Sequence, residues 1–163
     1  AWARPGMRQS DMDTRITLLP MTEAYAPGAA RLDQITFPGE AWSEEAFLRE
    51  ARTPSSFYVA AVLGEEVVGF AGMQQVLDEG YITNIAVAES CRRQGLGRAM
   101  LGALIDHCRE SGASFLTLEV RQSNAPAIAL YESMGFLPEG RRKNFYRQPT
   151  EDAILMTKRD LSL

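Results

Sequence analysis

Apolar and polar residues follow two different periods along the first half of the chain. Apolar residues recur at helical spacing before the Phe37-Pro38-Gly39-Glu40 turn and again after Ser43, a favourable helix N-cap residue. From Phe57 onward the spacing becomes that of strands, and the strands are separated by turn residues. The pattern predicts a strand at 15–19, helices at 22–37 and from Ser43, and strands at 57–63, 67–76 and 81–87.

The second half alternates helices with strands. Its longest helix has a wide apolar stripe and ends before Gly112, a residue suited to a helix C-terminus. Three consecutive strands favour antiparallel pairing, whereas the strand–helix–strand unit from Tyr81 to Val120 favours a parallel pair. We therefore expect an α/β (α+β) fold: a mixed, mostly antiparallel sheet with a central parallel pair and helices on both faces. The expected elements are helices at 96–111 and 125–134 and strands at 115–120, 136–140 and 153–156.

Length and composition narrow the function classes. The chain of 163 residues suits one domain, expected at 14–163, after a flexible N-terminal tail at 1–13 that lacks apolar periodicity. No run approaches the ~18 apolar residues of a membrane span, and no signal peptide is apparent, so we expect a cytoplasmic protein without a membrane partner. The net charge of −4 disfavours nucleic-acid binding, and a single histidine, His107, makes a metal site unexpected. His107 is expected to face solvent, and the oligomeric state is left open.

A glycine-containing loop is the most informative segment. It reads Arg92-Arg93-Gln94-Gly95-Leu96-Gly97-Arg98 and joins a predicted strand to the long helix. Two glycines, a helix N-terminus and three arginines suit a pyrophosphate. A Walker loop would need Gly-Lys-Ser/Thr, and a dinucleotide fingerprint would need a small residue where Met100 stands, so ATP and NAD fit poorly. Taken alone, the loop is also compatible with a solvated arginine cluster that has no ligand.

Three stretches match, in order and spacing, the motifs of one enzyme family. The loop residues Arg92-x-x-Gly95-x-Gly97 follow Asn84-Ile85-Ala86-Val87, and the match continues through Leu118–Asn124 and Ala129–Phe136. It ends with Glu151–Met156. This run resembles the GNAT superfamily of acetyltransferases, and within it the RimI-type branch that acetylates the N-terminal alanine of ribosomal proteins. The similarity is close over 84–156 and looser over 15–156.

The resemblance implies that acetyl-CoA is the cosubstrate and assigns the residues that hold it. Ile85, Ala86 and Val87 would pair with the pantetheine arm, and a backbone N–H near Val87 would stabilise the oxyanion. Asn124 would contact the same ligand, or it would only cap the following helix. The pyrophosphate would bind the loop that contains Arg92, Arg93, Gln94, Gly95, Leu96, Gly97 and Arg98.

Two residues match the catalytic groups of the family. Glu119 matches the general base, and strand alternation separates it from the apolar face of Leu116, Leu118 and Val120. The alternative is an ordinary strand-end acid that pairs with an arginine. Tyr131 matches the general acid that protonates the departing thiolate, and its alternative is a core tyrosine. The family reacts by direct attack of the amine, and the sequence offers no clear nucleophile for an acetyl-enzyme.

Acceptor recognition has the weakest signals. The family's Phe-Pro-Trp-Ser is interrupted here between Phe37-Pro38 and Trp42-Ser43, and the segment Arg141–Tyr146 resembles its Arg-Asn-Tyr-Tyr with Phe145 in place of one tyrosine. We expect a protein N-terminus as acceptor, as in an alanine-starting small-subunit ribosomal protein, and we hypothesise that Glu40, Glu44 and Glu79 attract its basic start. The alternatives are a GNAT enzyme that acetylates a small-molecule amine and a non-catalytic acyl-CoA sensor.

Overall fold

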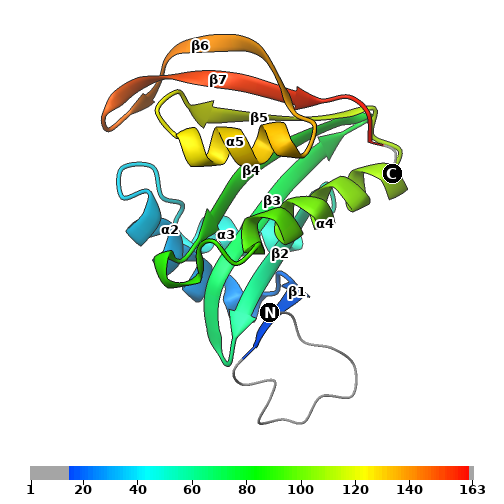
Figure 1. The fold of residues 1–163 in the computed structure, drawn as a ribbon. Coiled ribbons are helices and arrows are strands. Elements are labelled where there is room, and N and C mark those ends of the chain that lie inside the picture. Colours follow the sequence, from blue (N-terminus) through cyan, green and yellow to red (C-terminus); the bar gives the residue numbers. More distant parts are fainter. Residues whose placement is uncertain (1–14, 162–163) are drawn as a thin grey trace.

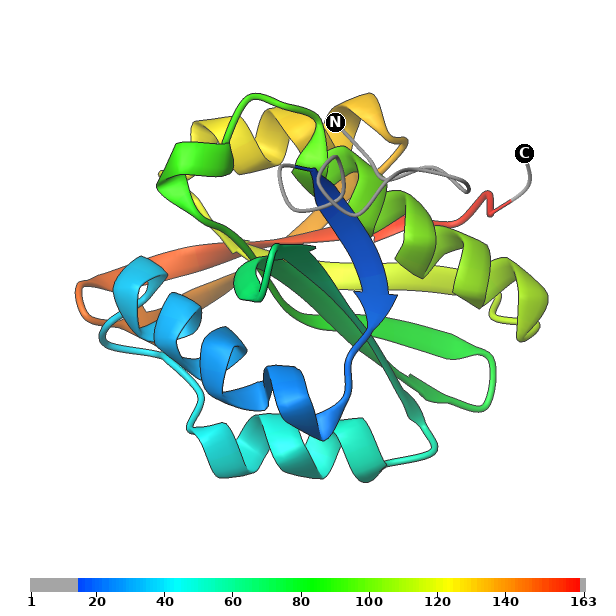
Figure 2. The ribbon, with the colours of Figure 1, turned by 90° about the horizontal axis from the view of Figure 1, so that it is seen from below.

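The computed structural model describes residues 15–161 as a twisted seven-stranded sheet with helices on both faces (Figures 1 and 2). The predicted tail at 1–13 lies outside the described residues. Strand order in the sheet is β1-β2-β3-β4-β5-β7-β6, and β4 with β5 is the one parallel pair in it. The predicted fold class is thus confirmed. The strands are β1 (Ile16–Pro20), β2 (Ser56–Leu63), β3 (Glu66–Val76), β4 (Glu79–Val87), β5 (Phe115–Arg121), β6 (Leu137–Arg147) and β7 (Thr150–Lys158).

The helices form two layers, one on each side of the sheet (Figure 2). Helices α2 (Ala26–Thr36) and α3 (Glu44–Arg52) cover one face, and α4 (Leu96–Glu110) and α5 (Ala125–Ser133) cover the other. Two short 3-10 helices, η1 (Glu23–Tyr25) and η2 (Glu89–Cys91), lead into α2 and follow β4. Ser43 caps α3 as predicted, because its side chain accepts a hydrogen bond from the Ala46 N–H.

Each helical layer buries its own core against the sheet. On the α2–α3 side, Phe47 and Phe70 pack edge to face with ring centroids 5.0 Å apart, and both are fully buried. On the α4–α5 side, the apolar stripe of α4 packs on the alternating residues Leu116, Leu118 and Val120 of β5. Burial of these apolar side chains is the main stabilising contribution, and it leaves the opposite face of β5 to Glu119.

Three local predictions were wrong. The first helix does not begin at Thr22: η1 intervenes, and α2 begins at Ala26 with Pro27 in its first turn, where proline is tolerated. β6 and β7 are both longer than the predicted strands at 136–140 and 153–156. β6 is an exposed edge strand that forms through backbone pairing, and two bulges interrupt it, so its residues show no regular alternation of apolar and polar positions. His107 does not face solvent freely, because its ring stacks on Phe57 at a centroid distance of 4.0 Å.

Candidate active site

The parallel strands β4 and β5 pair over a short stretch and then part (Figure 1). Their register runs from Glu79 opposite Phe115 to Tyr81 opposite Thr117, although β4 continues to Val87 and β5 to Arg121. The register with β3 shifts next to this point and leaves Thr83 of β4 without an opposite residue. Such a bulge bends and twists a strand, which turns the end of β4 away from β5. The result is an opening between two strand ends.

The edge of β4 that borders the opening carries unpaired backbone groups. The Ala88 N–H donates to the Val68 carbonyl, so Ala88 and Ala86 direct their polar backbone groups toward β3. By alternation, Ile85 and Val87 direct theirs toward the opening. The Arg92 Nε donates to the Val87 carbonyl at 3.2 Å, which leaves the Val87 N–H as a donor at this edge. The expected strand contact of a pantetheine arm and the expected oxyanion donor both have suitable groups here.

The glycine loop is shaped by two backbone positions. Arg93 has a φ of +64° and Gly95 one of +80°, both in the left-handed region. Gly95 is the N-cap residue of α4 and offers no capping side chain, so the first N–H groups of α4 are free for an anion. Gly97 contributes differently, because a Cβ there would lie 3.2 Å from Leu130, and its absence permits close packing of α4 on α5.

The arginines of the loop point to different neighbours. Arg98 donates to the Ser133 hydroxyl of α5 at 2.7 Å, and Arg92 contacts Val87 as described above. Gln94 donates to the Ser90 carbonyl at 3.4 Å, whereas the exposed Arg93 lies at the left-handed turn. Leu96 is buried and anchors the start of α4. The loop therefore presents backbone N–H groups under positive charge, as a pyrophosphate requires.

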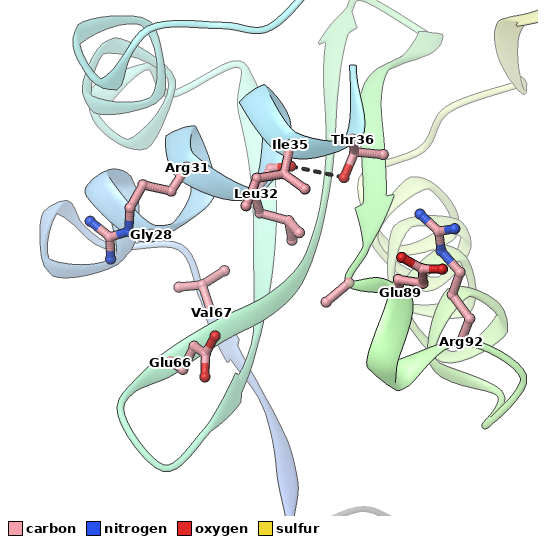
Figure 3. A pocket seen from close by; sticks show the side chains of 10 residues that line it. Gly28, Arg31, Leu32, Ile35, Thr36, Glu66, Val67, Glu89 and Arg92 are labelled. Atoms are coloured by element: carbon pink, nitrogen blue, oxygen red, sulfur yellow. Dashed lines mark hydrogen bonds between the residues drawn. The ribbon is translucent and has the colours of Figure 1, made fainter. Parts of the chain in front are cut away.

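A cavity of about 420 Å³ lies between α2 and the segment after β4, and Arg92 is one of the residues that line it (Figure 3). Leu32, Ile35 and Thr36 of α2 face Glu89 and Arg92 across it. Neither Glu119 nor Tyr131 lines this cavity, so it is separate from the opening between β4 and β5.

Glu119 lies on β5 just beyond the last paired residues and is almost entirely buried, with 6% of its side chain exposed. Its carboxylate accepts a hydrogen bond from the Tyr81 hydroxyl and forms an ion pair with Arg142 of β6 at 2.9 Å. Burial and the hydrogen bond to Glu119 raise the pKa of Tyr81 above its usual value. Arg121, the nearby arginine in sequence, forms its ion pairs with Glu40 and Glu151. A buried, oriented carboxylate at the mouth of the opening is suited to accept a proton.

Tyr131 lies on α5, whose layer covers the face of the sheet opposite Glu119. It is buried in the α4–α5 core, its ring centroid is 5.9 Å from that of Phe136, and burial raises its pKa to about 12. Asn124 is the N-cap of α5 and accepts a hydrogen bond from the Ala127 N–H at 3.3 Å. The capping role expected for Asn124 is therefore present, and Tyr131 has the core position that was its alternative role.

Three residues of this neighbourhood were not identified as site residues from the sequence: Tyr81, Arg142 and Tyr146. Burial raises the pKa of Tyr146, as do the nearby charges of Glu40 and Glu119, and Tyr131 adds to this effect. The Arg121 guanidinium carbon lies 4.4 Å from the centroid of the Tyr146 ring, so Tyr146 is beside the end of β5. The resemblance had marked the segment that contains Arg142 and Tyr146 without assigning either a role, and no sequence signal pointed to Tyr81.

The three acids considered for acceptor attraction have different surroundings. Glu79 pairs with Phe115 at the closed end of the parallel pair, about 13 Å along the strand from the level of Glu119. Glu44 is exposed in the first turn of α3. Glu40 forms an ion pair with Arg121, which neutralises its charge next to the opening. Strand order and register thus place Glu79 away from Glu119, and its role in attracting the acceptor stays a prediction.

The comparisons with known proteins agree with this geometry. Residues 26–136 match the Acetyltransferase (GNAT) family. The chain belongs to the GNAT acetyltransferase family. It is 45% identical over 138 residues to the [Ribosomal protein bS18]-alanine N-acetyltransferase of Escherichia coli strain K12, covering 80% of this chain and 88% of that protein. As a GNAT protein with N-acetyltransferases among its relatives, the chain is an acetyl-CoA-dependent N-acetyltransferase.

Solved GNAT structures share the fold. The crystal structure of the ribosomal-protein-S18-alanine N-acetyltransferase from Escherichia coli superposes with a TM-score of 0.78 at 39% identity, covering 88% of this chain and 92% of that one. Arabidopsis thaliana NAA60 in complex with acetyl-CoA has a TM-score of 0.80 at 22% identity, covering 87% and 97%, and shows the likeness of fold alone. Within residues 15–161, no helix is long and apolar enough to cross a membrane, and no cluster of His, Cys, Asp and Glu suits a metal ion.

Proposed function

We propose that this GNAT protein transfers the acetyl group of acetyl-CoA to the α-amine of a protein N-terminus, and that the acceptor is the alanine-starting ribosomal protein bS18. The proposal is supported by the relative from Escherichia coli, which bears that activity in its name and matches most of both chains. The observation that carries the chemistry is the buried Glu119 carboxylate at the point where β4 and β5 part.

The cosubstrate fits the opening and its loop. Ile85 and Val87 present backbone groups to a pantetheine arm, with Ala86 between them turned to β3. The N–H groups of the loop from Arg92 through Arg98, at the N-terminus of α4, would bind the pyrophosphate, and Arg93 adds positive charge beside them. Asn124, which caps α5, would contact the same ligand. When bound, acetyl-CoA supplies the activated acetyl group.

Side chains of this protein can accept and supply the protons that move during the transfer. The neutral amine attacks the acetyl carbonyl carbon, and its nitrogen loses a proton to Glu119 as the new carbon–nitrogen bond forms. The Val87 N–H donates a hydrogen bond to the carbonyl oxygen as charge develops on it. The carbon–sulfur bond then breaks, and the Tyr131 hydroxyl supplies the proton that the sulfur takes up. Solvent returns the proton from Glu119 to Tyr131, so both residues regain their initial states.

The pKa of the acceptor favours an α-amine. An α-amine has a pKa of about 7.8 and a lysine about 10.4, so the neutral fraction at pH 7 is larger for the α-amine by about 400-fold. A single carboxylate such as Glu119 therefore has less deprotonation to perform on a protein N-terminus than on a lysine.

The test is the initial rate of CoA thiol release with acetyl-CoA and three acceptors. One is a peptide that starts Ala-Arg, the second is the same peptide with a blocked N-terminus and a free lysine, and the third is spermidine. We expect turnover with the free α-amine alone. Turnover with spermidine alone would replace the protein acceptor by a small amine. Acetyl-CoA binding without turnover of any acceptor, including bS18 itself, would contradict the catalytic proposal and favour an acyl-CoA sensor.

A further inference from the structure

One guanidinium, that of Arg121, connects two segments that are far apart in sequence. Arg121 is the last residue of β5, and its side chain is 17% exposed. It forms ion pairs with Glu40, in the connection between α2 and α3, and with Glu151 of β7 at 3.1 Å. It also donates to the carbonyls of Gln148 at 3.4 Å and Pro149 at 2.9 Å, in the turn between β6 and β7. Its guanidinium carbon lies 4.4 Å from the centroid of the Tyr146 ring.

The two segments also touch one another directly. A Cβ on Gly39 would lie 2.6 Å from the Gln148 side chain, so the absence of a side chain at Gly39 permits the contact. An open pocket of about 100 Å³ at this junction is lined by residues 36–40, Arg121 and Gln148. The 36–40 segment and the 148–149 turn therefore form two walls that meet at Arg121. A planar guanidinium with five donors can hold several acceptors in a fixed arrangement, which an ammonium cannot do.

These walls stand next to the proposed base. Arg121 follows Glu119 by two residues on β5, so both side chains lie on the same face of the strand, about 7 Å apart along it. α4 and α5 cover the other face, and β4 closes the pair at Tyr81. On the face of β5 that carries Glu119, Arg121 thus places the 36–40 segment and the 148–149 turn within two residues of the proposed base.

We propose that Arg121 is a positioning residue for the acceptor: by holding Glu40 and the 148–149 turn together, it sets the width of the acceptor entrance. This inference rests on the proposed function. Arg121 then affects the binding of the acceptor and not that of acetyl-CoA, because the loop proposed to bind the pyrophosphate of acetyl-CoA is at the start of α4. It also changes the role of Glu40, which serves as the partner of Arg121 rather than as a free charge that attracts a basic peptide.

The test compares Arg121→Gln and Glu40→Gln with wild type in steady-state kinetics with the Ala-Arg peptide. Both variants lose the connection between the walls, and we expect the KM for the peptide to rise by about tenfold, while the KM for acetyl-CoA changes less than about twofold. The double variant should be no worse than the more affected single variant, because both remove one interaction. Arg121→Lys should not restore the KM, since lysine keeps the charge without the planar fork.

Three further variants separate this role from folding and from net charge. Gly39→Ala inserts a methyl group between the walls without a change in charge and should raise the peptide KM in the same direction. Gly140→Ala, whose Cβ would meet nothing within 4 Å, and Arg147→Gln, which removes an exposed arginine of β6, are the matched controls and should leave both KM values unchanged. Melting temperatures confirm that each variant is folded.

The outcomes distinguish this inference from the proposed function. If wild type acetylates the peptide and folded Arg121→Gln and Gly39→Ala keep its KM, the positioning role is overturned while the proposed function stands. A full rescue by Arg121→Lys, or an equal rise in the KM for acetyl-CoA, also overturns it. If wild type acetylates no peptide N-terminus, the proposed function fails first and the inference fails with it.

Discussion

The Tyr81 hydroxyl donates a hydrogen bond to the Glu119 carboxylate across the point where β4 and β5 separate. Tyr81 is the last residue of β4 that pairs with β5, and Glu119 lies two residues beyond its partner Thr117. The Tyr81–Glu119 hydrogen bond thus joins the two strands just beyond their last backbone pair. With Arg142 bound to its other oxygen, the carboxylate is held by groups from β4 and β6, and this fixes its direction before an acceptor arrives.

Replacement of Glu119 by Gln should remove the proton acceptor and keep the shape of the site. We expect kcat to fall by about 100-fold or more, with the KM for acetyl-CoA nearly unchanged, because the base acts on the acceptor nitrogen. Steady-state rates of CoA release measure this effect. Glu132→Gln, which alters an exposed acid of α5, is the matched control. A folded Glu119→Gln enzyme with wild-type kcat would exclude Glu119 as the base.

The Tyr81→Phe variant tests how much the orientation of Glu119 contributes to the rate, separately from its role as proton acceptor. Loss of the hydroxyl leaves the Arg142 ion pair in place, so we expect a smaller fall in kcat, about tenfold. The same assay measures it, together with a pH–rate profile for the variant. If the fall equalled that of Glu119→Gln, Tyr81 would be a direct participant in proton transfer and the present assignment of roles would be wrong.

Tyr131→Phe should lower kcat by about 10-fold to 1000-fold without a large change in either KM, since the hydroxyl acts on the leaving group. The raised pKa of Tyr131, about 12, keeps the hydroxyl protonated throughout the working pH range. The wild-type kcat should therefore show no loss from ionisation of Tyr131 below about pH 11. A wild-type alkaline limb near pH 8 that disappears in Tyr131→Phe would contradict this expectation.

Gly95→Ala tests the loop separately from the catalytic pair. Gly95 has a φ of +80°, which an alanine adopts only with strain, although a Cβ there would meet no atom within 4 Å. We expect the KM for acetyl-CoA to rise by about tenfold with little change in the peptide KM, because the strained turn displaces backbone N–H donors. Gly102→Ala in the interior of α4 is the control, and it should stabilise the protein by up to about 1 kcal/mol.

The buried tyrosines should make the fold sensitive to alkali. Burial raises the pKa of Tyr58, Tyr81, Tyr131 and Tyr146 in the folded protein, so the unfolded chain loses these protons first as pH rises. Their contribution to stability is complete below the unfolded pKa of about 10 and is lost as pH rises above it. Urea unfolding at pH 8, 9.5 and 10.5 should show a falling free energy of unfolding. Tyr131→Phe should reduce that slope, and an unchanged slope would contradict the assignment.

The fold could be predicted largely from the sequence because its strong signals are local. The apolar stripe of α4, the alternation of Leu116, Leu118 and Val120, and the Ser43 cap each follow from the chemistry of neighbouring residues. The failures have the opposite origin. β6 exists through pairing with β7 rather than through its own pattern, and the ring of His107 is covered by Phe57, a residue 50 positions earlier.

For the site, the sequence alone singles out Glu119 and Tyr131 and predicts that Glu119 faces away from the core, since alternation along one strand requires no knowledge of the rest. It also determined that the Gly95 loop begins a helix. The surroundings of these residues depend on how the chain folds: the separation of β4 and β5, the contacts of Glu119 with Tyr81 and Arg142, and the junction at Arg121. These contacts join residues up to 81 positions apart, and their geometry depends on strand register and bulges, which local patterns do not encode.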